Sequence, residues 1–115
     1  MQYVMLIYDA EERWAAMPEA EQMRVIGLHQ ATVEKATADG AYLGGNRLVD
    51  THAATTVRQH NGKITVSDGP FAETKEQLGG YYLLDCKDLD QAIGYANMLQ
   101  YEGMGSVEIR PVFEM

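Results

Sequence analysis

Near its beginning the chain reads Gln2-Tyr3-Val4-Met5-Leu6-Ile7-Tyr8, a run that is apolar at nearly every position. Side chains alternate along a strand, so one side of this run carries Tyr3, Met5 and Ile7 and the other carries Val4, Leu6 and Tyr8. A short, β-rich run that is apolar on both sides is typical of a central strand covered on both faces. A second run of this kind reads Gly80-Tyr81-Tyr82-Leu83-Leu84. The two runs predict a sheet with two faces to cover.

Two helices are predicted to cover one of these faces. Pro18 suits the first turn of a helix that runs to about Asp39, with Gly40 as its C-terminal cap. At about 100° per residue, one side of this helix is an apolar stripe with His29 in its middle, among Val25, Ile26, Val33 and Ala36. Residues 9–17, before the helix, are predicted to form a polar loop that contains Trp14.

The second helix has its own start signal. Asp88 is a predicted N-cap, and Gln91 completes a capping box three residues later. Its expected buried stripe consists of Leu89, Ala92, Ile93, Ala96 and Leu99.

The other segments predict shorter strands and turns. Residues 41–43 begin a strand, and Gly44-Gly45 marks a bulge or a close approach of two backbones. Residues 55–59 and 63–67 form a hairpin around Asn61-Gly62, because both turn positions need a positive φ. Residues 68–70 form a second turn, and residues 72–78 fit either a short helix or a connector. Residues 106–112 form a last strand whose Pro111 places it at a sheet edge.

This order of elements predicts an α+β fold in a single domain over residues 1–115. It indicates a ferredoxin-like antiparallel sheet with both helices on one face and an inserted β-hairpin. The second apolar face then needs a cover, and we expect a second copy of the chain to supply it in a homodimer. The alternative is that the hairpin folds over this face within one chain.

Composition excludes several classes of protein. The chain has 115 residues and a net charge of −8, from 17 acidic and 9 basic side chains, and it contains no basic cluster. We therefore expect no direct contact with nucleic acid and none with a membrane surface. Cys86 is the only cysteine, so there is no intrachain disulfide. The N-terminus lacks the positive region of a signal peptide, and the expected location is the cytoplasm.

The segment that begins at Asp68 reads Asp-Gly-Pro-Phe-Ala-Glu-Thr-Lys-Glu and continues as Gln-Leu-Gly-Gly-Tyr-Tyr to Tyr82. It resembles the DGPF branch of the YCII-related proteins, and the order of elements from Met1 to Phe113 resembles that family too. The resemblance implies a ferredoxin-like fold that dimerises into an α/β barrel. It implies an enzyme, because the YCII branch carries a His–Asp pair in a pocket. It also implies an alternative, a non-catalytic regulatory module linked to extracytoplasmic-function sigma factors.

His29 and Asp68 are the candidate catalytic pair. A histidine in an apolar stripe fits a general acid or base, or else a structural histidine that bonds a backbone carbonyl. The resemblance adds weight to the first role, because the YCII-branch histidine lies on the same helix, and both roles stay open. Asp68 could orient His29 or contact a ligand, and it could instead accept backbone hydrogen bonds within its turn.

Four further residues are candidates for substrate binding. Arg47 could hold an anionic ligand or form a surface ion pair. Tyr8 and Tyr81 fit the core, with hydroxyl groups that could reach a pocket. Phe71 fits core or interface packing, or the wall of a ligand pocket. Trp14 could be a lid over that pocket or an interface contact.

No metal and no cofactor are predicted. His29, His52 and His60 lack metal-ligand spacing, and the chain has no glycine-rich phosphate loop. The sequence therefore favours a binder of small molecules or a cofactor-independent acid–base enzyme.

Overall fold

The first strand is followed by a helix that the sequence did not predict. The computed structural model describes residues 1–114. It begins with strand β1 (Gln2–Asp9), helix α1 (Glu11–Ala16) and helix α2 (Glu19–Ala38). The predicted loop at residues 9–17 is thus wrong, because α1 occupies most of it. Its first turn carries Glu11 and Glu12, whose charges favour a helix N-terminus.

The next elements are β2 (Tyr42–Arg47), a turn of 3-10 helix η1 (Thr51–Ala53), and the hairpin strands β3 (Thr55–His60) and β4 (Lys63–Asp68). After them come β5 (Gln77–Asp85), α3 (Leu89–Met98) and β6 (Ser106–Pro111). Within residues 72–78 the structure has no helix, and β5 begins at Gln77.

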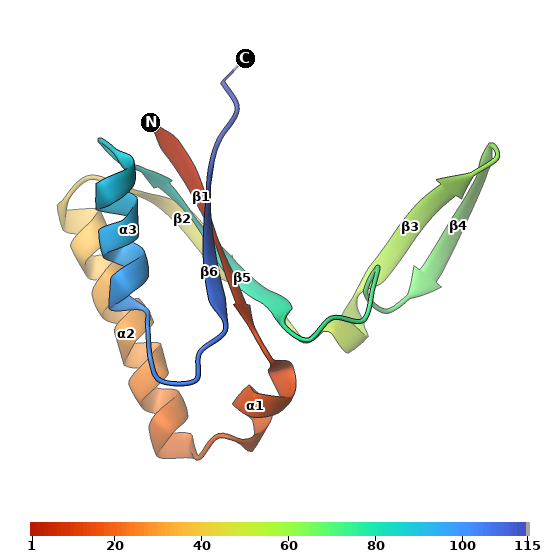
Figure 1. Cartoon of the computed structure of the whole chain (residues 1–115), viewed down its shortest axis with the longest axis horizontal. Helices are drawn as coiled ribbons and strands as arrows, with labels where there is room; N and C mark the ends of the chain where they lie inside the picture. Colours follow the sequence, from red (N-terminus) through yellow and green to blue (C-terminus); the bar gives the residue numbers. More distant parts are fainter. Residues whose placement is uncertain (115) are drawn as a thin grey trace.

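Four strands form one antiparallel sheet in the order β2-β5-β1-β6. In its register Met5 lies opposite Tyr82 on one side and opposite Ile109 on the other. Strand β6 is an edge strand, as Pro111 predicted, and it ends at Pro111, just before the predicted end at residue 112. The architecture is therefore α+β, with an antiparallel sheet, helices and a separate β-hairpin (Figure 1).

The core lies between α2, α3 and one face of this sheet. Met5 and Leu99 are fully buried, and the rest of the cluster is Tyr3, Ala36, Ala41, Leu84, Cys86, Ala92, Tyr95 and Ala96. Because side chains alternate, Val4 and Leu6 point to the other face, which neither α2 nor α3 covers. We call this second side of the sheet the open face.

The N-terminus of helix α3 is capped as its sequence predicts. The Asp88 side chain accepts a hydrogen bond of 2.8 Å from the Gln91 N–H, and the Gln91 side chain accepts one from the Lys87 N–H. The predicted stripe of α3 is partly wrong. Leu89 and Ile93 are 48% and 39% exposed, whereas Tyr95, which the prediction left out, is buried.

Gly45 permits a close approach in β2, as the glycine pair predicted. A Cβ at this position would lie 2.6 Å from the Tyr81 carbonyl oxygen and would collide with the Tyr82 ring. The pairing of β2 with β5 also shifts between Tyr42 and Gly44, so this segment contains a bulge. The absence of a side chain at Gly45 therefore leaves room for the Tyr82 ring.

The hairpin β3–β4 stands apart from the rest of the molecule. It turns at Asn61 and Gly62, both with positive φ, as predicted. Figure 1 shows it projecting from the sheet on the side opposite α2 and α3. The Cα radius of gyration is 16.1 Å, whereas a compact domain of this length has about 13 Å. The hairpin thus does not fold over the open face within one chain.

No helix within residues 1–114 combines the length and the apolar character that crossing a membrane requires.

Candidate functional site

A cavity of about 860 Å³ lies between α1, α2 and the sheet. Ligand pockets commonly have volumes of about 300–1,000 Å³, so this one suits a small molecule. Its wall is mostly apolar and aromatic, with contributions from Ile7, Trp14, Val25, Ile26, Val33, Tyr42, Tyr82, Tyr101 and Met104. A few polar side chains from β2 and α2 reach the same space.

His29 is one of these polar side chains. Helix α2 carries it on the side that faces the sheet, and its Nδ1 lies 2.7 Å from the Tyr82 hydroxyl oxygen on β5. The two rings lie 5.8 Å apart between centroids. This hydrogen bond fixes the imidazole, whose Nε2 has no hydrogen-bond partner among residues 1–114. One ring nitrogen is thus anchored and the other is available to a ligand.

The surroundings keep this pair neutral. Burial lowers the pKa of His29 below 6.5, and the charge of Arg47 lowers it further. Burial also raises the pKa of Tyr82 above 10, with a smaller effect from Tyr42. At neutral pH the cavity therefore holds an uncharged imidazole beside an uncharged phenol.

Arg47 supplies a positive charge to the wall. It lies near the end of β2, and its guanidinium carbon is 5.2 Å from the centre of the Trp14 ring on α1. This is a cation–π distance. Within the described part of the chain, Arg47 forms no salt bridge with a carboxylate. Its charge is available to an anion in the cavity.

Two carboxylates of the wall are already engaged. Asp9 accepts hydrogen bonds from the Tyr101 hydroxyl and from the Ala10 N–H, and it lies 3.7 Å from Arg13 Nε. Glu11 accepts bonds of 2.7 and 2.9 Å from the backbone and hydroxyl of Thr51. These contacts tie α1 to β1 and to η1. The remaining acidic side chains of the wall are Glu34 and Asp50.

The structure brings His29, Arg47 and Tyr81 of the predicted residues to this cavity. Tyr81 accepts a hydrogen bond of 3.0 Å from the Asn46 side chain. Tyr8 is not part of the wall, because its neighbour Ile7 points into the cavity and alternation turns Tyr8 the other way.

Asp68 and Phe71 do not reach the cavity of their own chain. Asp68 is exposed at the end of β4, and Phe71 is 72% exposed, so Phe71 fills no core within one chain. Among residues 1–114, no hydrogen bond reaches the Asp68 carboxylate, which differs from the turn role expected for it. The turn is instead held by backbone and hydroxyl groups, since the Gly69 N–H donates to Ala54 and the Gly69 carbonyl accepts from Thr56.

Sequence reasoning missed Tyr82 as a functional residue. Both Tyr81 and Tyr82 stand in an apolar run, and alternation alone does not say which one faces the helices. The register of β5 against β1 decides it, because Tyr82 lies opposite the buried Met5. The sequence of a single strand does not predict its register against a neighbouring strand.

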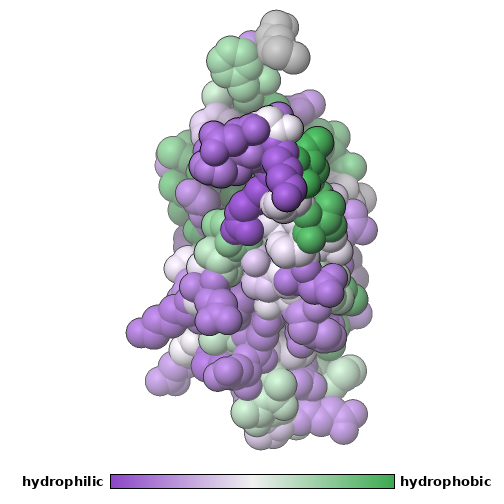
Figure 2. Space-filling view, turned by 90° about the vertical axis from the view of Figure 1, so that its right-hand side faces the viewer, coloured by the Kyte–Doolittle hydropathy of each residue, from purple (hydrophilic) through white to green (hydrophobic). Residues whose placement is uncertain are grey.

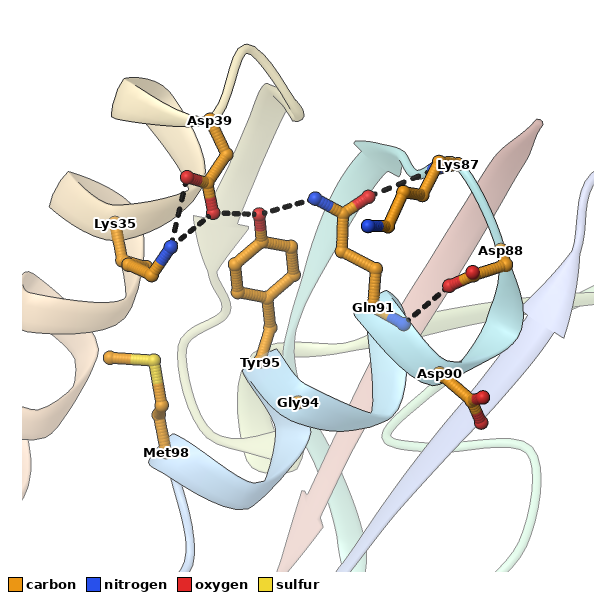
Figure 3. A pocket seen from close by; sticks show the side chains of 9 residues that line it. All are labelled: Lys35, Asp39, Lys87, Asp88, Asp90, Gln91, Gly94, Tyr95 and Met98. Carbon is orange, nitrogen blue, oxygen red and sulfur yellow. Dashed lines mark hydrogen bonds and ion pairs between the residues drawn. The ribbon is translucent and has the colours of Figure 1, made fainter.

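A second hollow, of about 660 Å³, lies between the end of α2 and α3 (Figure 3). Its polar groups bond one another. The Tyr95 hydroxyl donates to Asp39 at 2.6 Å, and Lys35 and Gln91 complete the network. Lys35 and Tyr95 lower the pKa of Asp39, and burial and Asp39 raise that of Tyr95 to about 12. We interpret this cluster as a link between two helices.

The described residues include no group of three or more His, Cys, Asp or Glu side chains that could hold a metal ion.

Comparisons with known proteins agree with this architecture. The profile of the YCII-related domain matches residues 1–115. An uncharacterised protein of Rhizobium meliloti (strain 1021) is 42% identical over 114 residues, which cover 97% of this chain and 92% of that protein. Among solved structures, the 5-chloro-2-hydroxyhydroquinone dehydrochlorinase of Burkholderia phenoliruptrix AC1100, in complex with 2,5-dihydroxybenzoquinone, superposes with a TM-score of 0.53. It shares 10% sequence identity, over 100% of this chain and 96% of that one. At this identity the likeness concerns the fold.

Proposed function

The chain belongs to the YCII-related domain family, and we propose that it is a cofactor-independent enzyme that performs acid–base chemistry on a small, planar organic anion. One observation carries this proposal. Among residues 1–114, a neutral His29–Tyr82 pair and an arginine without a salt bridge to a carboxylate share one cavity whose wall is mostly apolar and aromatic. An aromatic wall suits a flat ligand, and the guanidinium suits its negative charge.

The proposed chemistry is the transfer of one proton. In the tautomer that this proposal requires, the proton is on Nδ1 and Nδ1–H donates to the Tyr82 oxygen, so that Nε2 accepts a proton from a C–H or O–H of the ligand. The ligand becomes more negative and His29 becomes an imidazolium, and Arg47 stabilises the new charge. The imidazolium then returns the proton at another atom of the ligand. Protons balance, and no oxidant or reductant takes part.

The dehydrochlorinase of similar fold was solved with a hydroxylated quinone. This supports the proposal in one respect, since that protein holds a small ring compound in a similar architecture. The regulatory alternative linked to sigma factors rests on the sequence resemblance alone. The assignment of this chain to the DGPF branch rests on the same resemblance.

We also propose that the chain forms a homodimer in which two ferredoxin-like sheets make an α/β barrel. The open face supports it. Val4 and Leu6 on β1 and Leu83 on β5 point to this face, which neither α2 nor α3 covers. An apolar sheet face in water favours association with a second sheet.

The test of function uses two probes, salicylate and 2,5-dihydroxybenzoquinone. Calorimetric titration of the purified chain should show binding, and Arg47→Gln should weaken it at least about tenfold because a charged contact is lost. Arg58→Gln is the matched control, since Arg58 lies on the hairpin outside the cavity. Equal affinity of wild type and Arg47→Gln, or no binding of either probe, would contradict the assigned ligand class.

The chemistry has a separate readout. Exchange of the quinone ring hydrogens for deuterium, followed by proton NMR in D₂O, should be faster with the wild-type chain. His29→Gln keeps a side chain that can bond Tyr82 but cannot take up a proton. This variant should bind the quinone and lose the acceleration.

A further inference from the structure

The hairpin of residues 55–68 is the least supported part of the described chain. Its two strands pair only with each other, and every residue of β4 is exposed. An isolated two-stranded hairpin is marginally stable in water, because a third strand or a packing partner is needed to bury a face. We call residues 55–68 the arm.

The arm has two unlike faces. In its register Val57 lies opposite Val66, and Gln59 lies opposite Ile64, so these side chains share one face. Val57, Ile64 and Val66 are 64%, 65% and 66% exposed there. The opposite face is polar and consists of Thr56, Arg58, His60, Lys63, Thr65 and Ser67. Figure 2 views this side of the molecule and shows strongly hydrophobic groups along one edge of a hydrophilic cluster.

The arm leaves the sheet on the side of the open face (Figure 1). The arm and the open face are therefore found on the same side of the molecule. A molecule seated on the open face would also meet the arm.

The solvent-exposed area of this chain indicates how large a surface that molecule would cover. The chain exposes 7970 Å², whereas a folded monomer of 12.8 kDa exposes about 6,300 Å². The excess is about 1,700 Å², and a stable interface covers about 800 Å² per partner, with larger areas in obligate homodimers. The excess exposed area is thus in the range that each chain of an obligate homodimer buries.

The charges of the arm and the body are complementary. Residues 55–68 contain Arg58 and Lys63 against Asp68, a net charge of +1. The whole chain carries −8, so the rest carries −9, because −8 minus +1 is −9. A basic arm is therefore attracted to the acidic body of another copy.

We propose that the arm is exchanged between two copies of this chain, each arm lying with its Val57–Ile64–Val66 face against the body of the partner. This inference rests on the proposed homodimer and goes beyond it, since the sheets alone could pair while the arms stayed free. The exposed Phe71, at the base of the arm, would be covered in the same assembly.

The first experiment is sedimentation velocity over a concentration series. A triple variant, Val57→Thr, Ile64→Thr and Val66→Thr, keeps β-branched side chains and removes the apolar face. We expect its dimer dissociation constant to rise at least about 100-fold, because three apolar side chains on each arm lose their burial. The matched control changes the polar face, with Thr56→Ser, His60→Gln and Thr65→Ser, and should dimerise like wild type.

The second experiment needs no variant. Hydrogen exchange of the wild-type chain, measured above and below the dissociation constant, should slow in residues 55–68 when the dimer forms. A monomeric wild-type chain would overturn both the dimer and the exchanged arm. A stable dimer with unchanged affinity in the triple variant and with no protection of residues 55–68 would overturn the arm alone.

Discussion

His29 is a histidine whose partners make its protonation costly. It bonds Tyr82, it is largely buried, and Arg47 is close enough to repel an imidazolium. A folded-state pKa below 6.5 means that the unfolded chain binds a proton before the folded chain does. The contribution of His29 to the free energy of unfolding is therefore fully present above pH 6.5. It is lost as the pH drops from 6.5 to the pKa of His29 in the folded chain.

This gives a prediction for acid stability. Urea denaturation at pH 7.5, 6.5 and 5.5 should show a smaller loss of unfolding free energy for His29→Gln than for wild type. His60→Gln, on the exposed arm, is the control and should follow wild type. If His29→Gln loses stability as steeply as wild type, the imidazole is not the group responsible.

Gly45 is a second residue whose identity matters to the site. A methyl group there would collide with the Tyr82 ring and lie 2.6 Å from the Tyr81 carbonyl oxygen, so the ring or the strand must move. We predict that Gly45→Ala lowers the free energy of unfolding by about 1–3 kcal/mol in urea denaturation, as overpacking does.

The matched control for Gly45→Ala is Gly27→Ala. Gly27 lies within α2 with no heavy atom within 4 Å of an added Cβ, so that variant should gain about 0.5–1 kcal/mol from helix propensity. An unchanged stability of Gly45→Ala would mean that β2 can shift away from β5 at little cost.

At the scale of helices, strands and turns, the sequence predicted the features that depend on a few neighbouring residues. The Asn61-Gly62 turn, the Asp88 cap and the edge strand that contains Pro111 all lie where the sequence predicted them. Each depends on the backbone chemistry of a few neighbouring residues. The short helix α1 was missed because its six residues bury no side chain and leave no apolar period to read.

The candidate site was predictable only in part, because it joins segments that are far apart in the sequence. His29 could be proposed from the stripe of α2 and the family resemblance, and Arg47 from its position after a glycine pair. Tyr82 could not, because its direction depends on the pairing of β5 with β1. Asp68 was proposed from a conspicuous motif and lies outside the cavity of its own chain, so its role stays a prediction.

At the scale of the whole molecule, the exposed area and the projecting arm have a thermodynamic consequence. If folding and pairing are coupled, the unfolding temperature depends on protein concentration by mass action. We predict that a 100-fold dilution lowers the melting temperature by several degrees, since it removes about 2.7 kcal/mol per mole of dimer. Circular dichroism at two path lengths measures this. A melting temperature that is independent of concentration would contradict the proposed dimer.

The contact between Arg47 and Trp14 gives the molecule an optical property. Trp14 is the only tryptophan of the chain, and its indole lies in the cavity wall against the guanidinium. The fluorescence of an indole responds to a nearby positive charge. An anion that draws Arg47 away from the ring therefore changes the emission wavelength and the quantum yield of Trp14. All of the tryptophan fluorescence of this protein thus originates at the cavity, and the chain carries a built-in reporter of what enters it.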